Sequence, residues 1–378
     1  MSAKQLRVLQ VVPSLSRAAG VSRFVYNMER YHDEKRVHYD FMHHAIRDGV
    51  YMHEKRYDEE LKVRGCSVYP VNYAGDDLRR FMHEVHEVFE KNGSNYDIVH
   101  CHMPNSAFCV LREAELVGIE HRVLHSHLNN SSDKFLHRLR NAPLNAIGKH
   151  YATDCIACSD DAGRFLFGSR PFTVINNGIP LEQFAYDSES RKLLRSELGI
   201  KETDPVVGCV GRLVKQKNYP FAVHVFAKFH EAFPDAKMLI LGDGDDREEL
   251  EGIITSEHLS NVVILAGVRE DINKLYSVMD VFFMPSLYEG LPVSAVEAQA
   301  AGLPCMYSYN VPRETDITGT GTFLSLDADI DKWTKTLENT FNRGRLTDNP
   351  ALLEQRGYSA KANAELLMQH YERLMESK

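Results

Sequence analysis

Short apolar runs, each followed by a helical pattern of apolar residues, recur along the whole chain and constrain its fold more than any other feature. One series starts at LRVLQVV, residues 6–12, and a second starts at VVGCVG, residues 206–211. Alternating short strands and helices are typical of a parallel sheet with helices on both faces. We therefore predict an α/β protein built from two doubly wound, Rossmann-like domains.

The two series separate within INNGIPLEQF, residues 175–184. A chain of 378 residues also exceeds the usual size of a single hydrophobic core. We predict an N-terminal domain over residues 1–182 and a C-terminal domain over residues 183–358. Because doubly wound sheets bind ligands at the carboxyl ends of their strands, we expect the active site in a cleft between these domains.

The charge and the hydropathy pattern argue against several classes of protein. A net charge of -9 argues against nucleic-acid binding, which requires a basic face. No apolar run is long enough to span a membrane, and the charged N-terminus leads directly into a strand, so we expect no secretory signal and a cytoplasmic location. The cysteines are scattered, and Cys155 and Cys158 lie in a predicted strand, where residues three apart face opposite ways. This CxxC pair is therefore not expected to be a redox or metal site.

Two cations follow the first strand of the second series, in VVGCVGRLVKQKN. Arg212 offers a bidentate fork for phosphate oxygens, and Lys217 offers a mobile point charge. Together they could neutralise a diphosphate without a metal ion. The alternative is a solvated loop with two ordinary surface charges, but the acidic motif EGLPVSAVE further along the chain favours the diphosphate.

That motif places two acidic residues around a predicted helix start, in PSLYEGLPVSAVEAQAAGLP. Pro292 suits the first turn of a helix, so Glu289, Gly290 and Leu291 would lie at its mouth. Free N–H groups and the helix dipole attract an anion at such a position. Glu297, about two turns further on, would be a second carboxylate beside the same ligand. The alternative is a capping Glu289 and a solvated Glu297.

Histidines occur at the ends of two predicted strands of the first series. His100 and His102 alternate in YDIVHCHMP, and His125 and His127 alternate in VLHSHLNNSS, so each pair shares one face of its strand. These histidines could suggest a metal site, but no carboxylate pattern accompanies them. Most such histidines are polar groups that are satisfied at sheet ends, and one of them could hydrogen-bond a substrate hydroxyl.

Two further segments allow both a functional and a structural interpretation. In SRAAGVSRF, Gly20 would let the backbone approach a ligand phosphate, or would only shape a strand-to-helix turn. Between Lys134 and Lys149 the chain carries basic and apolar residues but no acid. This region could rest on anionic lipid headgroups, or it could be a core-facing helix whose cations reach the solvent.

With these motifs in order, the chain resembles the retaining glycosyltransferases of the large family four, which have the GT-B fold. The E-x7-E motif, the diphosphate motif GRLVKQKN, the hinge motif VINNGI and the loops LGDGDDREELE and VILAGVRED all fit. HSHLNNSS, ACSDDAGRFLFG and SLYEGLPVSAVEAQAAGLPC most resemble the branch that builds capsular or exopolysaccharide repeat units. The resemblance implies two Rossmann-like domains that face each other across a cleft, and a C-terminal helix over residues 359–378 that returns to the N-terminal domain.

The resemblance also implies which residues of the C-terminal domain bind the donor. Arg212 and Lys217 would hold its diphosphate. Glu297 would bind the ribose hydroxyls, and Glu289 the hydroxyls of the transferred sugar. The nucleobase would lie along the loop of residues 267–269. The remaining implied contacts with the donor are those of Gly20, Val268, Gly290 and Leu291.

In the N-terminal domain, which would bind the acceptor, the resemblance places His127 at the sugar, with His125 as the less favoured alternative. The family usually has a Gly-Gly pair and then an acid in the first loop. Here that loop reads AGVS, Ala19 to Ser22, so Gly20 keeps one permissive position and the acid is missing.

As the resemblance implies, the protein would move a sugar, with retention of configuration, from a nucleotide diphosphate sugar to a glycan or a polyprenyl-diphosphate-linked acceptor. UDP is favoured over GDP because of the polysaccharide branch. No metal or other cofactor is expected, since fixed cations and a helix dipole would stabilise the leaving diphosphate. The acceptor hydroxyl would attack from the front face, and the departing phosphate oxygen would take its proton. The setting would be capsular or exopolysaccharide synthesis, with the protein attached peripherally to the inner face of the cell membrane.

Two other functions on the same fold stay open. One is a non-catalytic partner subunit that binds a nucleotide sugar or a glycan. The altered first loop favours it mildly, whereas the presence of Arg212, Lys217, Glu289 and Glu297 argues against it. The other is a nucleotide-sugar epimerase, which needs no acceptor. A nicotinamide oxidoreductase fits poorly, because the glycine fingerprint and the ribose-binding acid are missing.

Overall fold

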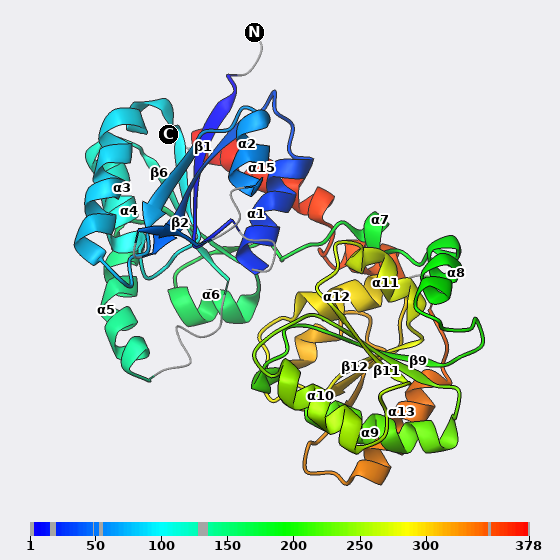
Figure 1. Cartoon of the computed structure of the whole chain (residues 1–378). Helices are drawn as coiled ribbons and strands as arrows, with labels where there is room; N and C mark the ends of the chain where they lie inside the picture. The colour runs from blue at the N-terminus through cyan, green and yellow to red at the C-terminus, as the bar shows by residue number, and fades with distance from the viewer. Residues whose placement is uncertain are drawn as a thin grey trace. The chain divides into compact units, whose positions relative to one another are not determined.

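The computed structural model describes residues 4–15, 20–47, 49–52, 56–127, 135–346 and 349–376; for residues 56 and 135–140 it describes the backbone alone. Two compact units are present: unit 1 comprises Met1–Gly178 and Ser359–Lys378, and unit 2 comprises Ile179–Tyr358. Each unit has its own sheet (Figure 1), and each has its own apolar cores. The predicted α/β class with two doubly wound, Rossmann-like units is confirmed.

The sheet of unit 1 is mostly parallel. Its described strands are β1 (Leu6–Val12), β2 (Val37–Arg47), β3 (Val50–Tyr51), β4 (Val68–Asn72), β5 (Ile98–Cys101), β6 (His121–Ser126), β7 (Asp154–Ala157) and β8 (Thr173–Val174). They are ordered β3-β2-β1-β5-β6-β7-β8, and β4 pairs with β2 off this path. Of the pairs between these strands, that of β2 with β3 is antiparallel. Because β1, β5 and β6 lie next to one another, the residues at their carboxyl ends are brought together.

Helices cover both faces of this sheet. The helices of unit 1 are α1 (Gly20–Tyr31), α2 (Arg56–Val63), α3 (Leu78–Asn92), α4 (Ala107–Leu116), α5 (Phe135–Tyr151), α6 (Asp160–Phe167), α15 (Ala360–Glu376) and the short 3-10 turn η1 (Gly93–Asn95). Side chains on β1 alternate between two cores. Leu9 and Val11 pack in the core that contains residues of α3 and α4, whereas Val8 and Val12 pack in the core that contains residues of α1 and α15.

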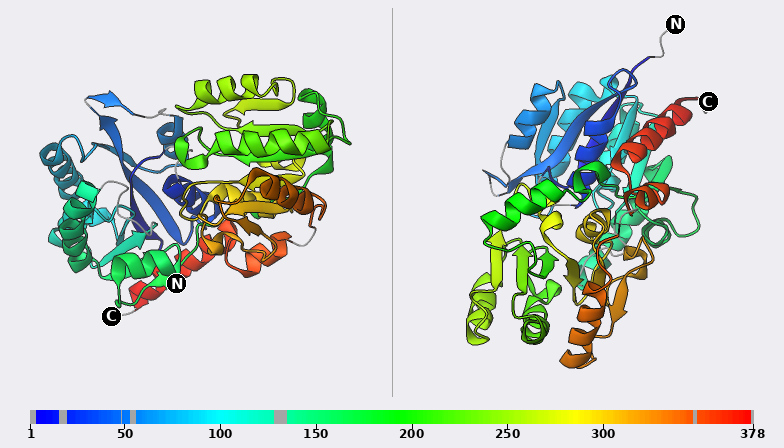
Figure 2. Two further views of the ribbon diagram at one scale, coloured as in Figure 1. Left: turned by 90° about the horizontal axis from the view of Figure 1, so that it is seen from below. Right: turned by 90° about the vertical axis from the view of Figure 1, so that its right-hand side faces the viewer.

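The C-terminal helix α15 belongs to unit 1 although it follows unit 2 in the sequence. Figures 1 and 2 show α15, in red, alongside α1, in dark blue. Its Leu367 and Tyr371 are fully buried in the core of unit 1. At the surface, the guanidinium of Arg36 donates to Glu365 and Glu372 of the helix, in each case with a bond of 2.7 Å. The helix therefore completes one of the two cores of unit 1.

Unit 2 is built on a parallel sheet with the strand order β11-β10-β9-β12-β13-β14. Its described strands are β9 (Val206–Val210), β10 (Lys237–Leu241), β11 (Val263–Gly267), β12 (Val281–Met284), β13 (Cys305–Ser308) and β14 (Thr322–Leu324). The helices are α7 (Leu181–Phe184), α8 (Ser188–Glu197), α9 (Tyr219–Ala232), α10 (Arg247–Ser256), α11 (Ile272–Val278), α12 (Val293–Ala300), α13 (Ile330–Phe341) and α14 (Asn349–Gln355), with the 3-10 turns η2 (Lys215–Lys217) and η3 (Arg313–Thr315).

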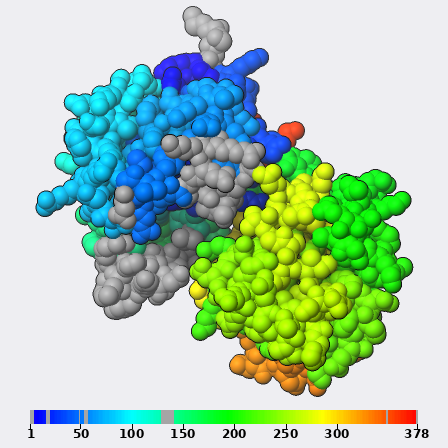
Figure 3. All heavy atoms as spheres, in the orientation of Figure 1, coloured from blue at the N-terminus to red at the C-terminus, as the bar shows by residue number. Residues whose placement is uncertain are grey.

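The residues of β9 again alternate between two cores. Val207 and Cys209 pack in the core with residues of α9, α10 and α13, and Val206 and Val210 pack in the core with residues of α11 and α12. Figure 3 shows residues of α9 and α10, in yellow-green, at the surface of unit 2 that faces the viewer. With both faces covered, the loops at the two edges of the sheet are left for polar and ligand-binding functions.

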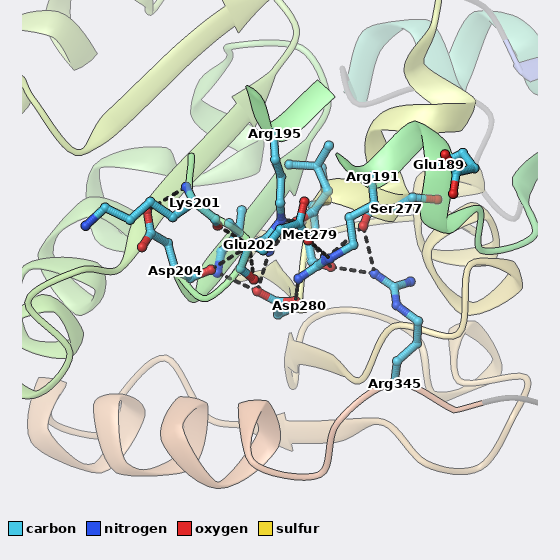
Figure 4. A network of polar contacts seen from close by, with 12 residues as sticks. Glu189, Arg191, Arg195, Lys201, Glu202, Asp204, Ser277, Met279, Asp280 and Arg345 are labelled. Carbon is cyan, nitrogen blue, oxygen red and sulfur yellow. Dashed lines mark hydrogen bonds and ion pairs between the residues drawn. The ribbon is translucent and has the colours of Figure 1, made fainter. Parts of the chain in front are cut away.

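A network of arginines closes the amino edge of the sheet of unit 2 (Figure 4). Asp280, directly before β12, accepts hydrogen bonds of 2.8 Å from both Arg191 and Arg195 and one of 2.9 Å from the backbone N–H of Val206. Arg195 is fully buried and also donates to the carbonyl of Val278 at the end of α11. The guanidinium of Arg345 donates to further carbonyls at the end of α11, and its burial lowers its pKa to about 10. Cations at a helix C-terminus complement the helix dipole, so this network ties α8 and α11 to the sheet.

The seven cysteines are all buried and free, so Cys155 and Cys158 form no disulfide. None of the helices in the described ranges is both long enough and apolar enough to cross a membrane.

Candidate active site

At the carboxyl edge of the sheet of unit 2, two glycine loops are packed against each other. Gly242, after β10, has φ +132° and lies so close to the loop after β9 that a Cβ would stand 2.0 Å from the carbonyl oxygen of Gly211. A Cβ on Gly244 would stand 2.4 Å from the carbonyl oxygen of Leu213. Any side chain at these positions would push the loops apart, so glycine is required to hold the chain that carries Arg212 and Lys217 in place.

The central feature of this edge is an ion pair between two of the predicted donor-binding residues. Lys217 Nζ lies 2.6 Å from Glu289 Oε1, and the two side chains are 16% and 6% exposed. Gln216 donates to the other carboxylate oxygen of Glu289, at 3.2 Å, and to the carbonyl of Tyr288, at 2.9 Å. Lys217 follows β9 and Glu289 follows β12, which are neighbouring parallel strands, so the sheet topology brings them together. A donor that binds both groups must compete with this ion pair.

The second predicted cation has a different environment. Arg212 is exposed, and within the described part of the chain no carboxylate forms an ion pair with it. Its guanidinium is therefore available to an anion in solution. Of the two cations that follow β9, Lys217 is thus paired with a carboxylate, whereas Arg212 has no such partner among the described residues.

The helix α12 begins one residue later than predicted. Pro292, which we expected in the first helical turn, is the N-cap instead, with an extended conformation (φ -74°, ψ 115°), and Val293 is the first helical residue. No side chain caps this helix start. Gly290 is exposed and Leu291 is half-buried. The backbone before α12 is thus available to solvent at the position where we predicted contact with an anion.

Glu297 lies in a different environment from Glu289. It is 1% exposed, and Tyr276 donates a hydrogen bond of 2.7 Å to its carboxylate. The interpretation of Glu297 as a solvated surface residue is therefore wrong. Its predicted contact with the ribose stays a prediction, as does the contact of Val268, which follows β11 and is 82% exposed.

The first loop of unit 1 is only partly described. Ala19 lies outside the described residues, and Gly20 is the exposed first residue of α1. Ser22 is buried, and its hydroxyl donates a hydrogen bond of 2.6 Å to the carbonyl of Ser14. The hydroxyl of Ser22 therefore holds the loop and does not replace the acid that the family usually has there.

The four predicted histidines meet in one stack at the carboxyl ends of β5 and β6, in which His100, His102 and His125 are buried and His127 is half-buried. The ring centroids of His125 and His127 are 3.9 Å apart, and those of His100 and His102 are 4.1 Å apart, with nearly parallel planes. Burial lowers the pKa of each ring, that of His127 to about 4 and those of the other rings well below 6.5. The stack is therefore neutral at physiological pH.

Nitrogens of His100, His102 and His125 lie within 4.8 Å of one another, close enough for a shared metal ion. However, His100 bonds through its nitrogens to Tyr371 and His125, and His102 bonds to Gln10 and His127. Stacked rings also direct their lone pairs along parallel planes and not toward a common point. The arrangement fits a hydrogen-bonded stack better than a set of metal ligands.

His127, the histidine predicted at the sugar, already has partners on both nitrogens. Its Nε2 lies 2.8 Å from Nδ1 of His102, and its Nδ1 lies 3.2 Å from Oδ1 of Asn177. Sequence reasoning missed the partners Gln10, Asn177 and Tyr371. Only Asn177 had a signal, since it is part of the hinge motif VINNGI; Tyr371 is 271 residues from His100, and nothing in the local sequence links them.

Comparison with protein-family models identifies both halves of the chain. Residues 18–183 match the model described as "Glycosyltransferase Family 4", and residues 190–344 match "Glycosyl transferases group 1". A Bacillus subtilis (strain 168) protein named "Putative glycosyltransferase EpsF" is 32% identical over 98% of this chain and 97% of its own. The chain belongs to the GT-B glycosyltransferases of family 4. The resemblance inferred from the motifs is confirmed to that extent.

Other relatives match this family 4 glycosyltransferase in part or in fold. An Escherichia coli UDP-Gal:alpha-D-GlcNAc-diphosphoundecaprenol alpha-1,3-galactosyltransferase is 39% identical over 36% of each chain. The structure of Anabaena Alr3699/HepE in complex with UDP and glucose matches with a TM-score of 0.75 at 16% identity, over 99% of this chain and 100% of that one. A glycosyltransferase from Rickettsia africae ESF-5 matches with a TM-score of 0.77 at 15% identity, over 100% of both chains. These structures share the fold of the glycosyltransferase.

Proposed function

We propose that this glycosyltransferase transfers a hexose from a UDP-sugar, with retention of configuration and without a metal ion, to a glycan or polyprenyl-diphosphate-linked acceptor in capsular or exopolysaccharide synthesis. The likeness to EpsF along the whole chain supports a role in polysaccharide synthesis. The Escherichia coli relative is named for UDP-galactose and a diphosphoundecaprenol acceptor, which supports both substrate classes. The Anabaena structure with the same fold contains UDP and glucose, which supports a UDP-linked hexose.

One observation carries the proposal: Nζ of Lys217 and Oε1 of Glu289 lie 2.6 Å apart at the carboxyl edge of the sheet of unit 2. Glu289 lies shortly before the start of α12 in the chain. A cation and a carboxylate at that distance suit the two ends of a sugar diphosphate. Lys217 would bind the phosphate oxygens, and Glu289 would accept hydrogen bonds from sugar hydroxyls. Arg212, which follows the same strand as Lys217 and is exposed, would be a second cation for the diphosphate.

In this mechanism the bond between the anomeric carbon and the phosphate oxygen breaks while negative charge builds up on the diphosphate. Lys217, Arg212 and the N–H groups at the start of α12 would stabilise that charge. The acceptor hydroxyl would attack from the face that the phosphate leaves, and its proton would pass to the departing oxygen. The product would keep the α configuration of an α-linked donor. No side chain is required as a nucleophile.

We further propose that the protein attaches peripherally to an anionic membrane surface, where a polyprenyl-linked acceptor would be found. The predicted surface runs from Lys134 to Lys149. Lys134 and the side chains of Arg138 and Arg140 lie outside the part of the chain that the structure describes, so the predicted membrane surface stays a prediction. Support for it comes from the sequence pattern and from the lipid-linked acceptor in the name of the Escherichia coli relative.

The first test is a thermal-shift titration of the purified protein with UDP, GDP, ADP and their sugars, with and without EDTA. A ligand that binds the folded state raises the melting temperature by mass action. We expect UDP and one UDP-sugar to raise it equally in both conditions. A shift with GDP alone would contradict the proposed nucleotide, and a shift that EDTA abolishes would contradict metal-free binding.

The second test offers the selected donor with synthetic polyprenyl-diphosphate sugars and follows products by mass and by anomeric coupling constants. We expect an α-linked product only when acceptor is present. Binding of the donor without transfer or hydrolysis would favour the non-catalytic partner. A changed sugar without added acceptor would favour the epimerase.

A further inference from the structure

One glutamine joins the two loops of unit 2 that carry Lys217 and Glu289. Gln216 lies in the 3-10 turn η2, and its backbone carbonyl accepts a hydrogen bond of 2.8 Å from the N–H of Leu287. Its side-chain amide nitrogen donates to the carbonyl of Tyr288 at 2.9 Å and to Oε2 of Glu289 at 3.2 Å. Gln216 therefore bonds three consecutive residues of the segment that precedes α12.

The orientation of the Gln216 amide follows from its two partners. A backbone carbonyl only accepts hydrogen bonds, and a carboxylate that is paired with a lysine only accepts them as well. The amide nitrogen carries two hydrogens, one for each of these acceptors, whereas the amide oxygen could bond neither of them. The donor to Oε2 of Glu289 is thus the neutral amide nitrogen of Gln216.

The two oxygens of the Glu289 carboxylate are held by different kinds of donor. Nζ of Lys217, which is positively charged, lies 2.6 Å from Oε1. The donor to Oε2 is a neutral amide, and both of its hydrogens already have acceptors. A diphosphate is attracted to the charge of Lys217 and competes with Oε1 for it. Binding of a diphosphate would therefore release Oε1 and leave the bond between Gln216 and Oε2 intact.

A released Oε1 requires a new donor. The side chain of Glu289 is 6% exposed, and a buried carboxylate oxygen without a hydrogen bond is costly. A free nucleoside diphosphate ends at its β-phosphate and brings no donor to this position, whereas a nucleotide sugar brings the hydroxyls of its sugar. The site should therefore bind the nucleotide sugar in preference to the free nucleotide, as long as Oε1 keeps its direction.

The side chain of Gln216 is not needed to tie the two loops together. The bond from the N–H of Leu287 to the carbonyl of Gln216 involves the backbone alone. The amide nitrogen of Asn218 also donates to the carbonyl of Pro285, at 3.1 Å, and joins the same two segments at a second point. Both bonds would survive the loss of the Gln216 amide. That amide adds the bond to the carboxylate of Glu289 and the bond to the carbonyl directly before it.

We propose that Gln216 is a positioning residue, which holds Oε2 of Glu289 so that Oε1 stays directed at a hydroxyl of the transferred sugar once Lys217 has bound the diphosphate. The inference rests on the proposed function, because the sugar and the diphosphate are those of its donor. It adds a cause for the selection of that donor. The same three side chains favour a nucleotide that carries a sugar over the nucleotide that remains after transfer.

The preference for the sugar is the quantity that tests this role. Isothermal titration calorimetry of the full chain gives the Kd of UDP and the Kd of the UDP-sugar that raises the melting temperature most. Gln216→Met removes the amide and keeps the length of the side chain. We expect it to weaken binding of the UDP-sugar about five- to tenfold, the effect of one lost hydrogen bond, and to change the Kd of UDP less than about twofold.

A double-mutant cycle shows whether Gln216 acts through Glu289. In a Glu289→Ala background no carboxylate is left to position, so Gln216→Met should change the Kd of the UDP-sugar less than about twofold there. A distorted loop would weaken binding in both backgrounds, so the cycle separates positioning from a purely structural role. The control is Lys215→Met, on an exposed neighbour in η2, which should leave the ratio of the two Kd values unchanged.

A second variant, Gln216→Ala, makes the result independent of the folding of Gln216→Met and should weaken the UDP-sugar at least as much. The proposal is overturned if both variants bind the UDP-sugar as tightly as the unmodified protein does. It is also overturned if they weaken UDP and the UDP-sugar equally, or if the loss persists in the Glu289→Ala background.

Failure of this proposal and failure of the proposed function give different results. An unmodified protein that binds a UDP-sugar, shows the expected cycle and transfers no sugar would contradict only the proposed reaction. Transfer that does not depend on Gln216, together with an unchanged preference for the sugar, would contradict only the positioning role. If a GDP-sugar binds instead, the proposed nucleotide is wrong, and the same cycle is measured with GDP and that sugar.

Discussion

At the scale of single residues, the ion pair between Lys217 and Glu289 explains how the site is kept ready in the absence of ligand. With 16% and 6% exposure, neither side chain is free in solvent, so each charge needs a partner. In the proposed complex Lys217 would exchange the carboxylate of Glu289 for phosphate oxygens, whereas Glu289 would exchange Lys217 for neutral sugar hydroxyls. The charge of Lys217 would therefore be compensated in both states, and that of Glu289 would be stabilised by hydrogen bonds in the complex.

Removal of Lys217 should abolish most transfer. We expect Lys217→Ala to lower kcat by about 100-fold or more, because a fixed cation at the leaving diphosphate is lost. The matched control is Lys215→Ala, which removes an exposed cation from the same 3-10 turn, η2, and should change kcat less than about twofold. Steady-state kinetics with a saturating UDP-sugar measures both. Near-normal turnover of Lys217→Ala with an intact circular dichroism spectrum would show that Lys217 does not stabilise the leaving diphosphate.

Asp280 is expected to matter for stability and not for transfer. Arg195 is fully buried, and Asp280 is the carboxylate that balances its charge, so Asp280→Ala should lower the free energy of unfolding of unit 2 by about 3 kcal/mol. Trp333, the single tryptophan of the chain, is buried in unit 2, and its fluorescence during urea unfolding reports this unit.

The matched control for Asp280 is Glu202→Gln. Glu202 is 54% exposed and lies 3.6 Å from Arg191 in the same network, so its loss should change the free energy of unfolding by less than about 1 kcal/mol. Equal effects of Asp280→Ala and Glu202→Gln would show that the charge of Arg195 is balanced by its carbonyl partners alone.

The residues of the candidate site were predictable from sequence to different degrees. Arg212, Lys217 and Glu289 stand beside strand ends and a helix start, where residue type and position together suggest an anion site. The buried bond from Tyr276 to Glu297 was not predictable, because it joins two helices through tertiary packing. A short sequence pattern predicts which groups follow a strand, but not which distant side chain meets them.

At the scale of helices and strands, the apolar patterns predicted the elements well and their ends less well. α12 begins at Val293 and not at Pro292, because a proline can have the extended conformation of an N-cap as easily as a helical one. α1 begins at Gly20, which we had considered as part of the turn before the helix. Both differences fall on residues without a strong preference between the last loop position and the first helical position.

The helix α5 is fixed on one side by close packing against α4. A Cβ on Gly148 would stand 2.8 Å from the side chain of Ala107, so glycine lets the two helices approach each other. This contact lies near the C-terminal end of α5, whose basic residues Arg138 and Arg140 lie in its first half.

Charge reversal on α5 tests the proposed membrane surface. Arg138→Glu together with Arg140→Glu should weaken cosedimentation with anionic vesicles at low salt by roughly tenfold or more, since each basic residue near such a surface contributes about 1 kcal/mol. Lys332→Glu together with Lys335→Glu makes the same charge change on the exposed face of α13 and should have a much smaller effect. If both variants bind the vesicles equally, or if neither variant changes binding, the basic residues of α5 do not form the membrane-binding surface.

At the scale of the whole molecule, the change of pattern along the chain predicted two units, and long-range contacts set their limits. The sequence placed the first boundary after residue 182, whereas unit 1 ends at Gly178. Residues 176–178 stay with unit 1 because Asn363 donates to the carbonyl of Asn176 at 2.8 Å and Gly178 lies against the backbone before α15. Such contacts between segments far apart in the sequence leave no local pattern, so the boundary could be predicted only approximately.

The two units should differ in their response to acid, because the buried histidines lie in unit 1. Burial lowers the pKa of His44 and His127 to about 4, and it lowers the pKa of His100, His102 and His125 well below 6.5. In the unfolded chain these rings take up protons below a pH of about 6.5, while in the folded unit they stay neutral. The unfolded state then binds more protons, so the free energy of unfolding of unit 1 falls as the pH drops from about 6.5 toward 4.

Between pH 7 and pH 5 His44 and His127 should each lower the free energy of unfolding of unit 1 by roughly 2 kcal/mol. Hydrogen exchange followed by mass spectrometry, corrected for the intrinsic effect of pH, measures this for each unit separately. Peptides from β1, β5 and β6 should lose protection at pH 5, whereas peptides from β9 and β12 should lose less, because the histidines of unit 2 (His224, His230 and His258) are exposed or half-buried. His44→Leu should make unit 1 less sensitive to acid, since one neutral buried ring is replaced by an apolar side chain. Equal losses in both units would mean that carboxylates, and not the buried histidines, govern the response of this protein to acid.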